Sequence, residues 1–259
     1  MNHPQWEGDT LFLFQNLVFK DFRIRYRNMS LGILWSFINP LVMMGVLTFI
    51  FSRVFSDPSR PAAFPVFVLC GLVPYNFFTG AWLSGTISIV DNAGLVKRAP
   101  VPREVVPLAA VISNCVHLAI QLALLLGFTL AFHLGAGINW LWLPLLWTLF
   151  VAFVCGISLI SSAVNVFVRD TRYVVESFNL VLFWLVPVFY SFTMIPAKYA
   201  VVYRFNPVAA MVLAMRNILI EHQAPPGSLV INLVIAAGVT LASGIWIFRR
   251  LKFRFYEHI

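Results

Sequence analysis

The chain has 259 residues, of which 60% are hydrophobic and only 11% are charged, whereas roughly a quarter of the residues of soluble domains are charged. This composition excludes a soluble catalytic domain and predicts an all-α integral membrane protein. The formal net charge of +8 reflects membrane topology and does not indicate nucleic-acid binding.

The first predicted element is an amphipathic helix over residues 10–27. Its apolar residues recur at helical spacing, namely Leu11, Phe14, Val18 and Phe22. Asp21 and Arg25 form an i,i+4 pair of opposite charge on the same helix. Such a helix lies on the cytoplasmic surface of a membrane. A basic anchor for anionic lipid explains the same pattern, and both interpretations stay open.

Six transmembrane helices are predicted, because six apolar intervals can each cross a hydrocarbon core about 30 Å thick. They lie at about 31–52, 64–90, 105–133, 140–168, 175–195 and 228–248. The 64 residues Val105–Val168 contain no charged side chain, and as one helix they would be about 96 Å long. They must therefore reverse, and His133–Asn139 is the predicted turn. A break is also expected within the second interval, at Gly71–Pro74.

The basic residues orient these six helices. Thirteen of the 18 Lys and Arg residues lie on one side of the predicted map, and positive charge is retained on the cytoplasmic side. Both termini are therefore predicted to be cytoplasmic. The three cysteines all fall inside predicted spans without a paired spacing, so no disulfide framework and no metal site is predicted.

Two segments outside the spans have the composition of functional elements. The cytoplasmic link 91–107 contains three prolines and a glycine, which limit any helix to a turn or two near Asn92–Lys97. A stiff, charged loop of this kind suits docking against another protein, and a plain rigid inside loop is the alternative. On the outer side, 196–222 contains two apolar stretches too short to span, Tyr199–Tyr203 and Pro207–Ile220. They predict re-entrant helices that cover a cavity or pore.

No catalytic constellation is visible in the sequence. The Gly-x-x-x-x-Gly-Lys-Ser/Thr phosphate loop does not occur, so this chain is not expected to bind ATP in that manner. Small polar residues at helical spacing, Ser158, Ser161, Ser162 and Asn165, are typical of close helix packing. A nucleophilic role for Ser158 is the disfavoured alternative.

Two further clusters lie inside the predicted spans. Asn114, His117 and Gln121 share one helix face and predict hydrogen bonds between helices, with a wall of a transport path as the alternative. The second cluster is aromatic and consists of Tyr75, Phe77, Phe78, Phe183, Trp184 and Tyr190. Rings of this kind stack on sugars, but packing against lipid or core explains them equally well.

A set of short motifs resembles, in order, the permeases of ABC exporters that move lipid-linked polysaccharides. The motifs are Lys20–Arg27, Ser30–Trp35, Asn39–Leu41, Gly71–Phe78, Asn92–Pro107, Asn165–Asp170, Pro187–Tyr190 and Asn206–Pro207. Together they cover nearly the whole chain. The resemblance is nearest to O-antigen and teichoic-acid exporters, and capsule exporters resemble the chain less because Arg169-Asp170 is not characteristic of them.

The resemblance implies a homodimer of six-helix subunits in the bacterial inner membrane, bound to two separate ATPase subunits that hold ATP and Mg²⁺. This chain itself would bind no cofactor. The substrate implied is an undecaprenyl-diphosphate-linked polysaccharide, and the surrounding membrane lipid is a further partner. An ATP-independent flippase of lipid-linked sugars is the runner-up, although no Asp or Glu lies deep in a predicted span.

The same resemblance assigns residues to three roles. Coupling to the ATPase would involve Asn92, Gly94, Leu95, Lys97, Arg98, Asp21 and Arg25. The lipid diphosphate would enter near Arg23, Arg25 and Arg27. The six aromatic residues named above would line the glycan path between the two subunits.

Overall fold

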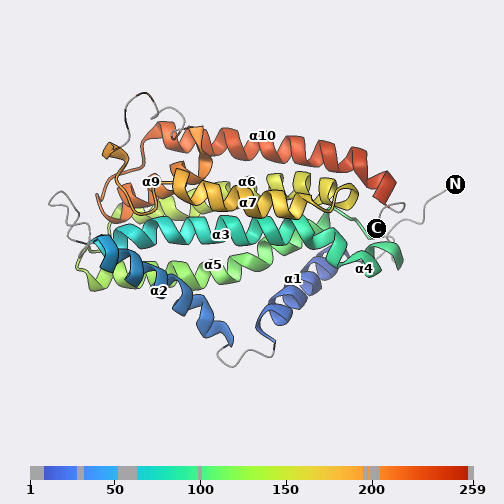
Figure 1. The fold of residues 1–259 in the computed structure, drawn as a ribbon, viewed down its shortest axis with the longest axis horizontal. Helices are drawn as coiled ribbons and strands as arrows, with labels where there is room; N and C mark the ends of the chain where they lie inside the picture. Colours follow the sequence, from blue (N-terminus) through green and yellow to red (C-terminus); the bar gives the residue numbers. More distant parts are fainter. Residues whose placement is uncertain are drawn as a thin grey trace.

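The computed structural model describes residues 9–27, 32–51, 63–98, 101–194, 196, 198, 203 and 205–255. Throughout this part of the chain the structure consists of helices and connecting segments without a strand, so the predicted all-α class is confirmed. Long helices run side by side along the molecule, with α4 at one end and α9 toward the other (Figure 1).

The helices follow the apolar intervals of the sequence. They are α1 (Thr10–Tyr26), α2 (Trp35–Phe49), α3 (Phe64–Asp91), α4 (Ala93–Arg98), α5 (Val105–Ala131), α6 (Trp142–Phe167), α7 (Thr171–Leu185), α9 (Pro207–Leu219) and α10 (Gly227–Leu251). Five of them, α2, α3, α5, α6 and α10, together with their flanking turns, are long and apolar enough to cross a membrane. Short 3-10 turns lie at Gly32–Leu34, Ile138–Leu141, Phe192–Met194 and Lys252–Arg254.

The predicted break at Gly71–Pro74 is wrong, because α3 continues through Pro74 without interruption. A Cβ added at Gly71 would lie 2.7 Å from the Cα of Val188, so another segment packs directly against α3 at this point. This close packing holds the helix across the proline, whose missing donor is tolerated inside membrane proteins when neighbours cover the site.

The fifth predicted span, 175–195, also needs correction. Its helix α7 begins earlier, at Thr171, and ends at Leu185, which gives a length of only about 22 Å. Val186 is extended, with φ −97° and ψ 133°, because a residue before proline disfavours the helical region. The chain after Pro187 is therefore non-helical up to the short turn at 192–194.

The turn between α5 and α6 and the start of α9 follow local sequence signals. His133 and Gly135 have φ values of 58° and 70°, and the left-handed conformation at Gly135 suits a residue without a side chain. Asn206 caps α9, where its side-chain oxygen accepts a hydrogen bond from Val208 N at 3.0 Å. The predicted short helix Tyr199–Tyr203 lies almost entirely outside the described residues.

The helices α3, α6 and α10 pack through small residues. A Cβ added at Gly85 would lie 2.5 Å from Ser158 Cβ, and one at Gly244 would lie 2.5 Å from the carbonyl oxygen of Gly156. Thr86 and Ser161 are joined across the α3–α6 contact by a hydrogen bond of 2.7 Å. The close packing predicted from the small polar stripe of α6 is confirmed.

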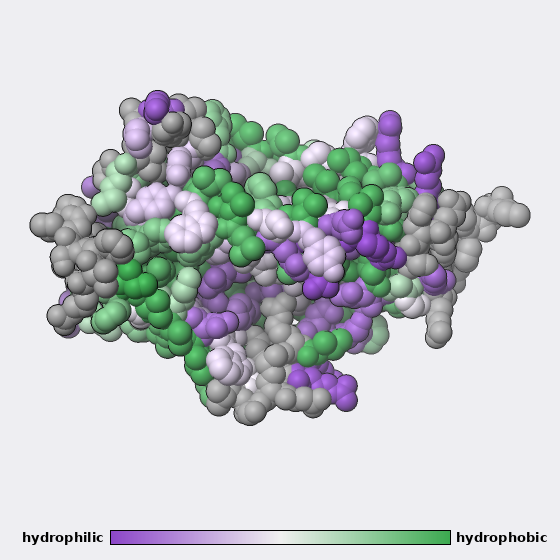
Figure 2. Space-filling view, viewed as in Figure 1, coloured by the Kyte–Doolittle hydropathy of each residue, from purple (hydrophilic) through white to green (hydrophobic). Residues whose placement is uncertain are grey.

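The surface divides by polarity along the long axis. Hydrophobic side chains cover much of the middle of the bundle, and hydrophilic ones gather mainly toward the end that carries α4 and the last turn of α10 (Figure 2). Exposed apolar side chains are especially frequent on α2, α7 and α10. A chain with this surface requires lipid or another membrane protein around it.

Candidate functional site

The N-terminal helix α1 is anchored on the bundle by one side. Its first turn is capped by Asp9, whose side chain accepts a hydrogen bond from Leu11 N at 2.8 Å. Leu17 is buried in a second apolar cluster at the α4 end of the bundle, and Phe14 and Val18 pack beside it. Of the predicted apolar stripe, Leu11 is exposed, whereas Phe14 and Val18 contact the bundle.

The short helix α4 is tied to α1 and α3 by one asparagine. The Asn92 side-chain amide donates to Ser88 O at 2.9 Å, and its carbonyl oxygen accepts a hydrogen bond from Lys20 Nζ of α1. The Asn92 backbone oxygen accepts from both Leu95 N and Val96 N. Because Val96 is also buried, α4 is held as a stiff turn rather than a free loop.

The predicted coupling residues lie on α1 and α4 and at the turn between α3 and α4. Gly94 and Lys97 are exposed, Leu95 and Asp21 are half-buried, and Asn92 forms the base of α4. Leu95 and Arg23 both line a shallow groove of about 560 Å³ between α1 and α4, and Arg27 is exposed. The side chains of Arg25 and Arg98 lie outside the described residues.

The start of α5 and the end of α10 meet at the same end of the molecule. Lys252 Nζ lies 2.7 Å from Glu104 Oε1, and the Arg103 guanidinium donates to the carbonyl oxygen of Lys252. Phe255 is fully buried and packs against Phe248 and Phe167. These contacts fix the two long helices beside α1 and α4.

The six predicted path aromatics form three pairs with different surroundings. Phe77 and Phe78 are buried in the subunit core, where they pack against Phe150. Trp184 has the opposite environment, with 67% of its surface exposed, and its carbonyl oxygen accepts a hydrogen bond from the Tyr190 hydroxyl at 3.0 Å. Tyr75 and Phe183 lie between these two pairs, with their rings 5.2 Å apart.

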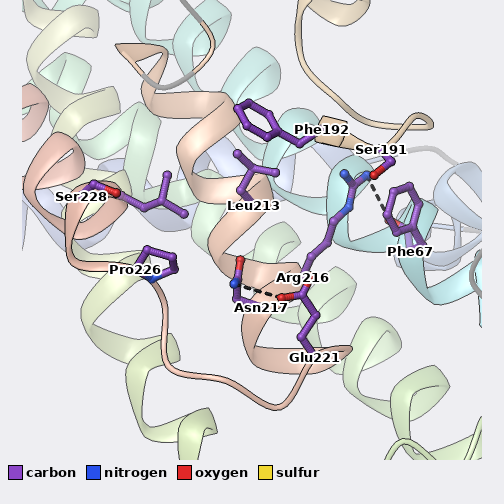
Figure 3. Close-up of a pocket in the computed structure, with 10 residues that line it drawn as sticks. Phe67, Ser191, Phe192, Leu213, Arg216, Asn217, Glu221, Pro226 and Ser228 are labelled. Carbon is purple, nitrogen blue, oxygen red and sulfur yellow. Dashed lines mark hydrogen bonds between the residues drawn. The ribbon is translucent and has the colours of Figure 1, made fainter. Parts of the chain in front are cut away.

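Arg216 is the residue that sequence reasoning missed. It is only 5% exposed, and its guanidinium donates to Val188 O at 2.8 Å and Tyr190 O at 3.3 Å. Its carbon lies 3.4 Å from the ring centroid of Phe67, as Figure 3 shows at the end of α9. The sequence revealed one cation in an apolar stretch, but only the fold brings three distant segments around it.

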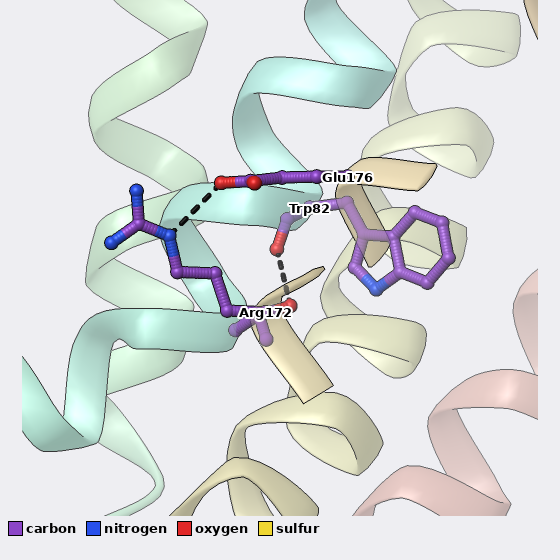
Figure 4. Close-up of polar contacts among 4 residues, drawn as sticks. Trp82, Arg172 and Glu176 are labelled. Atoms are coloured by element: carbon purple, nitrogen blue, oxygen red, sulfur yellow. Dashed lines mark hydrogen bonds and ion pairs between the residues drawn. The ribbon is translucent and has the colours of Figure 1, made fainter. Parts of the chain in front are cut away.

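An exposed ion pair lies on α7 near its N-terminal end. Arg172 Nε and Glu176 Oε1 are 2.9 Å apart, close to Trp82 of α3 (Figure 4). The Trp82 indole donates to Ser161 Oγ at 3.2 Å. Glu176 therefore has a basic partner.

His117 joins two helices, as one of the two interpretations predicted. Its Nδ1 lies 2.8 Å from Ser36 Oγ of α2, and its Nε2 lies 2.8 Å from Gln121 Nε2 of α5. The Asn114 amide donates to Ala110 O of its own helix. This histidine therefore holds α2 against α5. Among the described residues, no group of three or more His, Cys, Asp and Glu residues could hold a metal ion.

Comparison of the sequence with known proteins identifies its family. The sequence profile of the ABC-2 type transporter family matches residues 13–220. The chain is 31% identical over 254 residues to the O-antigen export system permease protein RfbA of Klebsiella pneumoniae, with 95% of both chains covered. It is 26% identical to RfbA of Myxococcus xanthus, again over 95% of both chains. It is also 26% identical to the polysialic acid transport protein KpsM of Escherichia coli, over 90% of this chain and 91% of that protein.

Proposed function

Because the chain belongs to the ABC-2 type transporter family, we propose that it is the transmembrane subunit of an ATP-driven exporter of lipid-linked polysaccharide. The observation that carries this proposal is the 31% identity to an O-antigen export permease across 95% of both chains. The substrate would be an undecaprenyl-diphosphate-linked glycan that crosses the bacterial cytoplasmic membrane. The similarity to KpsM makes a capsule polysaccharide the second candidate, and a teichoic acid is the third.

The working assembly in this proposal contains two copies of the chain and two separate ATPase subunits. The exposed apolar sides of α2 and α7 support contact between two copies, although lipid can cover the same surface. ATP and Mg²⁺ would bind to the ATPase subunits, and both termini of this chain would be cytoplasmic. The ATPase would dock on α1 and α4, because these helices form a stiff, basic surface with a groove between them.

The path of the substrate follows from charge and exposure. Arg23, which lines the groove, and Arg27 are exposed, and they would attract the lipid diphosphate together with Arg25. Trp184 and Tyr190 are the aromatic residues best placed to meet the glycan, since they lie on or next to the exposed side of α7. In this proposal the buried Phe77 and Phe78 do not contact the glycan but pack behind the residues that do. Tyr75 and Phe183 lie between the buried rings and the exposed ones.

The test begins in cells that make the glycan but lack this gene. We expect undecaprenyl-diphosphate-linked glycan to accumulate inside and surface glycan to disappear, as measured by mass spectrometry and surface labelling. The wild-type chain should restore export only when the partner ATPase can hydrolyse ATP. Export with a hydrolysis-dead ATPase would instead favour the ATP-independent flippase. The chemical structure of the accumulated chain would separate a polysaccharide from a polyol phosphate.

A matched pair of variants in α4 tests coupling. Leu95→Pro removes the hydrogen bond from Leu95 N to Asn92 O and restricts the backbone of Gly94 before it. We expect it to abolish the stimulation of ATP hydrolysis by substrate while leaving the subunit folded. Leu95→Ala is the control at the same position, since it also loses the leucine side chain but keeps the backbone N–H that donates to Asn92 O, and alanine favours the helix. Normal export by Leu95→Pro would remove α4 from the mechanism.

A further inference from the structure

A pocket of about 390 Å³ opens at the outer end, between α9, the first turn of α10 and the segment after α7 (Figure 3). Its volume lies within the roughly 300–1,000 Å³ of ordinary small-molecule sites. It is separate from the α1–α4 surface, because α4 and α9 lie toward opposite ends of the bundle (Figure 1). The proposed export function has so far assigned no role to it.

The lining combines apolar rings with hydrogen-bonding groups. Phe67 and Phe192 supply aromatic surface, and Ser191 and Ser228 supply hydroxyls. The Asn217 amide donates to Glu221 Oε2 at 3.1 Å, which holds an amide and a carboxylate side by side at the wall. A pyranose matches this lining, because its C–H face is apolar and its neighbouring hydroxyls both donate and accept hydrogen bonds.

The Arg216 guanidinium lies at the inner wall of the same pocket. Its three described hydrogen bonds all come from the two terminal nitrogens, and its Nε has no partner although it is buried. Within the described residues, no acidic oxygen lies close enough to form an ion pair with it. Arg216 therefore brings a positive charge, without an acidic partner among the described residues, to the wall of the pocket.

The charges that line the pocket indicate whether its ligand is a sugar or a free anion. Glu221 lines the pocket together with Arg216, and its negative charge would repel a phosphate anion but not a neutral sugar. We propose that this pocket binds one pyranose residue of the exported glycan as it leaves the membrane, an inference that rests on the proposed function. Asn217 and Glu221 hold the sugar hydroxyls, Phe67 and Phe192 cover the ring, and the positive charge of Arg216 lies beside an acceptor oxygen.

Binding can be measured on the full chain in lipid nanodiscs, without ATP or ATPase. The probes are the methyl pyranosides of glucose, galactose, mannose, rhamnose, N-acetylglucosamine and glucuronic acid, observed by saturation-transfer NMR. We expect at least one probe to bind, and Asn217→Ala to weaken it by about tenfold, as expected for one lost hydrogen bond to a buried ligand. Ser228→Trp, which fills the mouth of the pocket, should abolish the signal.

Asn16→Ala is the matched control. Asn16 is also an exposed amide bonded to a group four residues away on its own helix, but it lies on α1, and its removal should leave sugar binding unchanged. Melting temperatures of all variants show whether each has folded. Binding that survives Ser228→Trp, or no binding by any probe, would overturn the proposal.

Two further outcomes are distinguishable. Inorganic phosphate that displaces the sugar and binds more tightly would identify an anion site and would also overturn the sugar assignment. Because the assay needs no transport, it is independent of the cellular export test. If the chain binds sugar but loss of its gene causes no export defect, the proposed function is contradicted and the sugar pocket stands. If loss of the gene blocks export but no probe binds, the proposed function stands and the sugar pocket is contradicted.

Discussion

The two ends of the molecule use basic residues in opposite ways. At the α4 end, Lys20 is exposed and Lys252 is partly exposed, and each is held by a side chain of a neighbouring segment. At the α9 end, Arg216 is buried, and backbone carbonyl oxygens surround it. The arrangement at the α4 end leaves a charged surface to which another protein can bind. The arrangement around Arg216 stabilises the non-helical segment that follows α7.

This difference shows what each charge contributes. Between Leu185 and Phe192 the chain is non-helical, so the carbonyl oxygens of Val188 and Tyr190 need donors from elsewhere. The guanidinium offers five donors in a fixed plane, and it supplies these oxygens and that of Phe67 from one side chain. We therefore expect variants at the α9 end to affect folding and variants at the α4 end to affect coupling.

The largest effect is expected for Arg216→Met. Each buried carbonyl left without a donor costs roughly 1–3 kcal/mol, so the loss should reach about 3 kcal/mol or more. The melting temperature of the purified chain in detergent would measure it. Arg216→Lys should recover only a part, because one ammonium cannot reproduce the planar geometry of the guanidinium.

Arg250→Met is the matched control for this prediction. Arg250 lies over the Trp246 ring at 4.4 Å, but it is exposed, and such a contact is worth about 0.5–1 kcal/mol. Equal melting temperatures for the two methionine variants would contradict the structural role of Arg216.

An intermediate effect is expected for Lys20→Met, which removes the hydrogen bond between α1 and α4. Lys20 is exposed, so the stability cost should be only about 1 kcal/mol. Substrate-stimulated ATP hydrolysis should fall much more, because the two helices would no longer move together. A double-mutant cycle with Asn92→Ala would measure the coupling energy of the pair. Additive effects of the two changes would show that the hydrogen bond contributes nothing.

The smallest effects are expected for the carboxylates of the exposed ion pairs. Glu104→Gln should change stability by less than about 1 kcal/mol, because its pair with Lys252 is partly open to solvent. Glu176→Gln should leave the melting temperature unchanged, since Arg172 is still more exposed. A large destabilisation by Glu176→Gln would mean that this pair is covered in the assembled transporter. Melting curves in nanodiscs, with and without added salt, would provide the comparison.

Local chemistry made much of this fold predictable. The turn at His133–Asn139 and the start of α9 were signalled by glycines, Asn206 and Pro207, whose preferences act over a few residues. The short helix after Asn92 was likewise predicted to within a residue. The helix bounds fixed by such signals need no knowledge of distant contacts.

Features that depend on distant contacts were not predictable in this way. Pro74 was expected to break α3, but packing of Gly71 against Val188 overrides the local preference. The end of α7 did carry a local signal, Val186 before Pro187, and the helix ends at this point. The surroundings of Arg216 come from α3, α9 and the segment after α7, and no spacing within one segment reveals them. The roles assigned to the coupling and path residues stay predictions.

The close contact between Gly156 and Gly244 has a consequence for biosynthesis. Helix α6 leaves the ribosome well before α10, yet α10 packs so tightly along it that a side chain at Gly156 would overlap the backbone of Thr240. In the nascent subunit, the face of α6 around Gly156 therefore stays exposed to lipid until α10, the last helix, has been inserted. A chain truncated before Gly227 should thus be degraded quickly by membrane proteases, and pulse-chase labelling of its half-life against the full chain would show it.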